Sequence, residues 1–200
     1  MSDASVPDWI NAISAAMGAV AVIVGLFGAN SKINEAQRTA RELRRSQVAE
    51  ELIALAHNAE DAFRDIRNPF DSIPADKAHD ERYAYQMRFE RIGKYDELFR
   101  RLREAQIRVR AVVGNEAVDV ATSDLFAARN QVAIALKTLA EYVEDPPTAP
   151  SEHDRRFKVK LRGEIWGSFN ENDLLGKQII RSVETIEREL NPIARLEANK

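Results

Sequence analysis

The sequence contains no cysteine among its 200 residues. This absence excludes disulfide bridges, thiolate nucleophiles and cysteine-based zinc sites. Histidine is scarce too, because only His57, His79 and His153 are present. A metal site needs several converging ligands, and the Glu-x-x-His pairs of di-iron bundles are missing from the sequence. We therefore interpret the three histidines as surface residues beside carboxylates and expect no metal site.

Glycine and proline are also few, at 8 and 7 residues. No glycine-rich phosphate loop is present, because Gly163-x-x-x-Gly167 is not followed by Lys-Ser or Lys-Thr. No serine stands in a nucleophile-elbow context. The sequence thus predicts no catalytic residue, no cofactor and no small-molecule substrate, and we expect a protein that is not an enzyme.

Charge is missing from one long segment. Charged residues make up 30% of the chain, yet residues 9–29 contain none. A helix of this length, at about 1.5 Å per residue, is roughly 31 Å long and matches the hydrocarbon core of a bilayer. The alternative is a buried helix of a bundle in water, which the length and the lack of charge argue against. We predict a single transmembrane helix over residues 9–29.

The charges on either side of this segment predict its orientation. Residues 1–8 carry two aspartates and no cation, which also fits a cleaved signal peptide poorly. The following segment is basic. The positive-inside rule then places the C-terminal side in the cytoplasm. We expect an extracytoplasmic N-terminus (1–8), the span (9–29), a basic juxtamembrane helix (30–47) and a cytoplasmic helical bundle (48–200). The basic juxtamembrane residues are Lys32, Arg38, Arg41, Arg44 and Arg45.

Small residues recur along one face of the predicted span, and such faces let helices approach closely in lipid. Ala21, Gly25 and Ala29 also form a ladder at four-residue spacing. The alternative is that glycine and alanine are simply common in membrane spans. The residues predicted to support self-association are Gly18, Ala21, Gly25 and Gly28.

The remaining chain shows helical periodicity. Apolar residues recur every three or four positions within 31–67, 75–113, 116–144 and a last helix that we expect to end at Asn191-Pro192. Gly93 marks an interruption of the second pattern, and Gly114 and Asn115 are a C-terminal stop and an N-cap. The predicted buried stripes include Leu43, Val48 and Leu52 in the first pattern and Phe89 and Phe99 in the second.

Residues 152–168 fit two structures. Phe157, Val159 and Leu161 alternate as in a strand, whereas Phe157, Leu161 and Ile165 share one helical face. A single strand would have no partner, so we favour a helix that Gly163 and Gly167 break. Long helices joined by short loops predict an all-α fold, with the transmembrane helix followed by an up-and-down bundle that has coiled-coil character.

The second helical pattern is rich in arginine near its end. One hypothesis is an anion-binding patch for lipid or nucleic acid. The alternative, which we favour, is a solvated face with ion pairs inside the helix. The patch residues are Arg100, Arg101, Arg103, Arg108 and Arg110.

Three functions follow as hypotheses. The first is a membrane-anchored interaction, recruitment or sensing module whose partners are the bilayer and another protein or further copies of itself. The second is an effector whose span oligomerises and permeabilises the bilayer. The third and least favoured, for which the net charge of −3 gives no electrostatic support, is a nucleic-acid binder that uses the arginine-rich helix.

Overall fold

A computed structural model describes residues 6–70, 73–77, 79–145, 151–167 and 172–196, with the side chains of residues 6–31 and of Glu81 outside the description. The chain divides into two compact units, residues 1–44 and residues 45–200. Each unit is considered by itself below.

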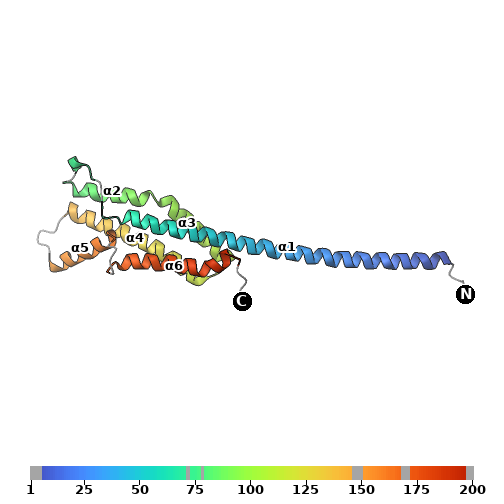
Figure 1. Ribbon diagram of the computed structural model, residues 1–200. Helices are drawn as coiled ribbons and strands as arrows, with labels where there is room; N and C mark the ends of the chain where they lie inside the picture. The colour runs from blue at the N-terminus through green and yellow to red at the C-terminus, as the bar shows by residue number, and fades with distance from the viewer. Residues whose placement is uncertain (1–5, 71–72, 78, 146–150, 168–171, 197–200) are drawn as a thin grey trace. The chain divides into compact units, whose positions relative to one another are not determined.

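The described residues form helices and no strand, which confirms the predicted all-α class. The prediction of a helix rather than a strand within 152–168 is also confirmed, since α5 covers most of that segment (Figure 1). The helices are α1 (Val6–Ile66), the short 3-10 helix η1 (Ala75–Lys77), α2 (Glu81–Gly93), α3 (Asp96–Val112), α4 (Glu116–Glu144), α5 (Glu152–Ile165) and α6 (Leu174–Ala194).

Side-chain caps fix where several helices begin. The Asp80 carboxylate accepts hydrogen bonds from the backbone amides of the first turn of α2, and Asn115 does the same for α4 as predicted. Ser151 and Asp154 form a reciprocal capping box at the start of α5. Asp173 caps α6 by accepting a hydrogen bond from the backbone amide of Gly176. Each cap satisfies amides that the helix itself leaves unpaired.

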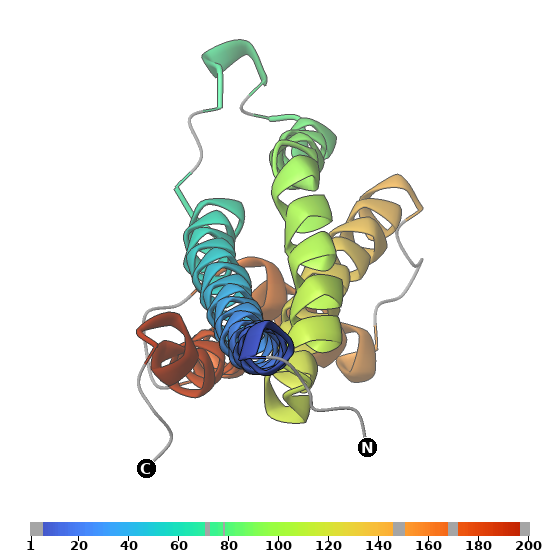
Figure 2. The same ribbon diagram turned by 90° about the vertical axis from the view of Figure 1, so that its right-hand side faces the viewer.

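Contacts between helices order residues 45–200 as four antiparallel columns. The first is the part of α1 within this unit, the second is α2 with α3, the third is α4, and the fourth is α5 with α6. Figure 2 views these columns close to end-on. Rings of Phe63, Phe99 and Phe126 join α1, α3 and α4, with Phe63 and Phe99 centroids 5.6 Å apart. The bundle is therefore up-and-down, with its second and fourth columns each broken once.

Most predicted apolar stripes form the core of the bundle. Val48 and Leu52 of α1, Phe99 of α3 and the α4 stripe up to Leu139 are buried. The prediction that Leu43 and Phe89 are buried is wrong, because their exposed fractions are 50% and 39%. Leu43 lies five residues before Val48, a rotation of about 140° around the helix, so the two residues do not share a face.

Two predicted helix ends are wrong. Gly163 lies inside α5, because burying Leu161 and Ile165 outweighs the cost of about 1 kcal/mol for a helical glycine. Pro192 lies inside α6, which continues to Ala194. Its missing N–H removes one helical hydrogen bond, but the last turn is held from outside, since Ser46 Oγ donates to the Ala194 carbonyl over 2.7 Å.

In the part of the chain that the structure describes, no helix is long and apolar enough to cross a membrane. The predicted transmembrane helix, residues 9–29, lies in α1 where the side chains are outside the description. The same holds for Gly18, Ala21, Gly25 and Gly28. The span and its self-association face therefore stay predictions.

Candidate interaction surface

The basic juxtamembrane residues lie on a part of α1 that is exposed on all sides. Every described side chain from Lys32 to Arg45 is exposed. Arg38 donates from Nε to Glu42 over 3.1 Å, one helical turn away. Within the described residues, no ion pair involves Lys32, Arg41 or Arg44. This segment thus presents cations that the fold does not neutralise.

The arginines of α3 are used differently. Arg100 pairs with Glu97 over 2.5 Å and also with Glu104, and its hydrogen bonds hold the pKa of Glu97 below the ordinary value despite some desolvation. Arg108 reaches Glu51 of α1 over 2.6 Å. The Arg100 pairs lie within α3, as the favoured alternative to an anion patch supposes, whereas the Arg108 pair joins α3 to α1.

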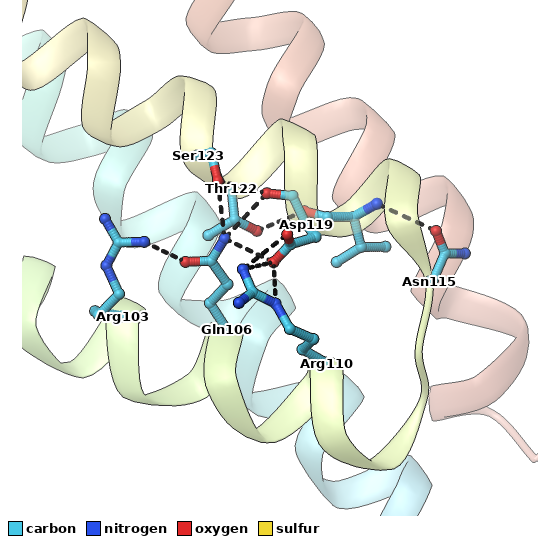
Figure 3. Close-up of polar contacts among 8 residues, drawn as sticks. Arg103, Gln106, Arg110, Asn115, Asp119, Thr122 and Ser123 are labelled. Atoms are coloured by element: carbon cyan, nitrogen blue, oxygen red, sulfur yellow. Dashed lines mark hydrogen bonds and ion pairs between the residues drawn. The ribbon is translucent and has the colours of Figure 1, made fainter.

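Two further arginines of α3, Arg103 and Arg110, make contacts around Gln106 at the side of α3 that faces α4 (Figure 3). The buried Gln106 donates from Nε2 to the carboxylate of Asp119 over 2.9 Å, and its Oε1 accepts a hydrogen bond of 2.7 Å from Arg103. Arg110 donates to both oxygens of the same Asp119 carboxylate. The guanidinium of Arg103 also stacks 3.7 Å above the Phe126 ring.

These contacts form a polar cluster between α3 and α4, made up of Arg103, Gln106, Arg110 and Asp119, which we call the polar clamp. Gln106 would cost free energy if it were buried without partners, and the clamp supplies partners to both ends of its amide. Of the five arginines in the hypothesised patch, Arg101 alone makes no hydrogen bond or ion pair among the described residues, although its charge contributes to the lowered pKa of Glu97. The cluster that looks most basic along the sequence is therefore largely neutralised within the fold.

A second buried polar cluster lies where α1 ends. The Arg67 side chain, 5% exposed, donates to Asp173 over 2.7 Å and to the carbonyls of Gly163 and Glu164. The Arg67 carbonyl in turn accepts the Gly167 amide at 2.8 Å. Asp173 is also the cap of α6, so one residue pair joins α1 to the break between α5 and α6. Sequence reasoning missed Arg67, because an arginine just after an apolar stripe resembles any helix-ending cation.

Cations of α2 also gather at the end of α1. Arg88 donates to the Asn68 carbonyl and Arg91 to the Asp65 carbonyl, which suits the negative end of the helix dipole. The Asp65 carboxylate accepts a 2.7 Å hydrogen bond from the Tyr95 hydroxyl. Burial raises the pKa of Asp65, but this bond and the neighbouring Lys94 charge outweigh it, so that the pKa is lowered overall. Burial and the bond to Asp65 raise the pKa of Tyr95.

An open groove of about 810 Å³ runs between α4 and α6. Val120 and Leu174 on its walls are 55% and 79% exposed. Its charged lining residues are of both signs. Residues that line the groove include Glu116, Val120, Asp124, Leu174, Gln178 and Arg181.

The histidines lie apart from one another. His57 is 3.3 Å from Glu187 of α6, and His79 and His153 are exposed. No group of three His, Cys, Asp or Glu side chains within the described ranges is arranged to hold a metal ion.

No protein-family model, curated protein or solved structure matches this sequence. The function must therefore come from the residues and contacts described above.

Proposed function

We propose that this protein is a membrane-tethered helical bundle that acts as a non-enzymatic interaction module. Residues 9–29 cross the bilayer, the basic segment from Lys32 to Arg45 lies at the cytoplasmic surface, and residues 45–200 present helical surfaces to a protein partner.

The observation that carries the proposal is the contrast between the two basic clusters. The arginines of α3 are mostly paired within the bundle. The cations between Lys32 and Arg45 are exposed, and among the described residues of this segment the ion pair is Arg38–Glu42. The unpaired cluster directly follows the charge-free run. Each cation near an anionic membrane surface contributes about 1 kcal/mol of attraction, so this is where a bilayer would use them.

A binding role rather than a catalytic one is supported by what the buried polar side chains do. Arg67 and Gln106 join helices, and Thr122 donates to the Val118 carbonyl one turn earlier at 2.7 Å. A general acid, base or nucleophile must instead face a bound substrate. These groups are held in contacts that stabilise the bundle.

The same contrast weighs against the nucleic-acid hypothesis. Phosphate binding depends on cations that exchange counterions for phosphate. In α3, Arg100, Arg108 and Arg110 already contact carboxylates. Binding a phosphate there would first break those pairs.

Membrane extraction of the full chain tests the tether. The apolar residues of the run contribute about −2.4 to −4.8 kcal/mol to insertion, and one central arginine costs roughly 2.5 to 3.5 kcal/mol. Val22→Arg is therefore expected to release most of the protein from carbonate-washed membranes, while Val22→Leu stays bound. The proposal fails if the unaltered chain is recovered in the aqueous fraction after ultracentrifugation without detergent.

A further inference from the structure

The exposed part of α1 carries an apolar line that no described residue covers. Ile33 and Leu43 are 54% and 50% exposed, and Ala36 and Ala40 between them are exposed as well. The four residues follow one another at spacings of three, four and three. This is the spacing of the core positions of a two-stranded coiled coil.

Most charges of the segment lie away from this line. If Ile33 and Ala40 occupy position a and Ala36 and Leu43 position d, then Arg38, Arg41 and Arg45 fall at the outward positions f, b and f. Glu35 and Glu42 fall at the outward position c. The 3.1 Å pair from Arg38 to Glu42 lies along that outer face. The basic face therefore stays available to the bilayer when the apolar line is covered.

The flanking positions admit a parallel copy of the same helix. Lys32 and Thr39 fall at position g, and Gln37 and Arg44 at position e. In a parallel pair, Lys32 then faces Gln37 of the second helix and Thr39 faces Arg44, so no two like charges meet across the interface.

The line also continues a feature of the predicted span. Ala21, Gly25 and Ala29 are spaced by four residues, and Ile33 comes four residues after Ala29. A small-residue ladder of this kind lets two helices approach in lipid. Two copies that meet along it would leave the bilayer with their Ile33 residues already side by side.

We infer that the segment from Ile33 to Leu43 pairs in parallel with the same segment of a second copy of this chain. The inference rests on the proposed function, because the shared bilayer fixes the parallel direction and raises the local concentration. Coiled coils in water need about three to four heptads, and this line spans fewer. The apolar line is therefore a pairing surface for tethered chains.

Cysteine scanning tests the inference cleanly, since the chain has no cysteine of its own. Single substitutions are made in the full-length protein in membranes, and disulfide formation under mild oxidation is measured by non-reducing gel. Disulfides need Cα atoms within about 7 Å, so roughly tenfold more crosslinked dimer is expected at the apolar line than on the outer face. The test variants are Ile33→Cys, Ala36→Cys, Ala40→Cys and Leu43→Cys, and the matched controls are Asn34→Cys, Arg38→Cys, Arg41→Cys and Arg45→Cys.

Carbonate extraction of the same samples separates the two proposals. Membrane-bound protein with uniform crosslinking, or with a maximum at Arg38 and Arg45, overturns the pairing surface and leaves the tether intact. Protein that appears in the aqueous fraction overturns the tether. Because the pairing surface rests on the tether, this outcome overturns the pairing surface as well, whereas uniform crosslinking of membrane-bound protein overturns the pairing surface alone.

Discussion

Single residues decide how the basic clusters of this protein are used. Arg108 and Glu51 are 57 positions apart in sequence, and Gln106 reaches Asp119 across a turn. Spacing along one helix does not reveal such partners. The favoured prediction of ion pairs inside the helix therefore accounts for Arg100, but not for Arg108 and Arg110, which pair with residues of other helices. Arg67 escaped prediction for the same reason, because its partner Asp173 lies 106 positions away.

The Asp65–Tyr95 contact predicts a specific pH response. Because the pKa of folded Asp65 lies below its unfolded value, the carboxylate stabilises the fold above the unfolded pKa, and this stabilisation is lost as the pH falls through the folded pKa. Tyr95→Phe removes the 2.7 Å hydrogen bond, so the pKa of Asp65 is expected to rise. Carboxyl-carbon NMR titration of the detergent-solubilised chain measures the pKa of Asp65 with and without the Tyr95→Phe substitution.

Glu97 provides the control within the same titration. Its lowered pKa depends on Arg100 and not on Tyr95, so it is expected to stay in place in the Tyr95→Phe variant. A shift of both groups together would mean that the substitution perturbs α3 as a whole. An unmoved Asp65 would contradict the role given to the tyrosine hydroxyl.

At the scale of elements, sequence periodicity predicted helices better than their ends. α4 covers 116–144 as predicted, because a regular apolar stripe lies between an asparagine cap and Asp145-Pro146. The helix ends predicted at Gly163 and Pro192 are wrong, because contacts with other elements outweigh local helix propensity at these two residues. The end of α3 at Gly114 was predicted, and its positive φ of 73° gives the physical reason.

Two glycine substitutions distinguish a glycine that ends a helix from a glycine inside a helix. Gly114→Ala forces a Cβ into the left-handed region and is expected to destabilise the bundle by about 1–2 kcal/mol. Gly163→Ala places a Cβ where no atom lies within 4 Å, in a helix interior, and is expected to stabilise by about 0.5–1 kcal/mol. Urea unfolding of the detergent-solubilised chain, followed by circular dichroism, measures both changes. Equal effects of the two substitutions would contradict the assigned backbone roles.

For the whole molecule, the sequence predicted the helical class and the up-and-down order, since both follow from long amphipathic segments joined by short connections. The candidate interaction surface was predicted only in part. The basic segment after the charge-free run was identified by its charge, but its complete exposure, and the contrast with the paired arginines of α3, required the structure.

For the proposed tether, charge is expected to control the orientation of the whole chain in the membrane. Neutralising Arg41, Arg44 and Arg45 with glutamine removes the charge bias that the proposal relies on to keep the C-terminal side in the cytoplasm. A mixed orientation is expected, measured by protease access to a C-terminal tag in sealed vesicles. The matched control replaces three exposed cations of the bundle with glutamine, and it is expected to keep one orientation. The cations replaced in the control are Arg155, Lys160 and Lys177. An unchanged orientation in the first variant would contradict the positive-inside assignment.

The position of α4 has a consequence for how the chain is made. α4 contacts α2, α3, α5 and α6, and it emerges from the ribosome only after α1, α2 and α3. Until then, the apolar faces of the first two columns have each other but not the helix that completes their burial. The apolar faces of the nascent chain are therefore partly exposed until α4 emerges, and the chain is most prone to aggregation during this interval.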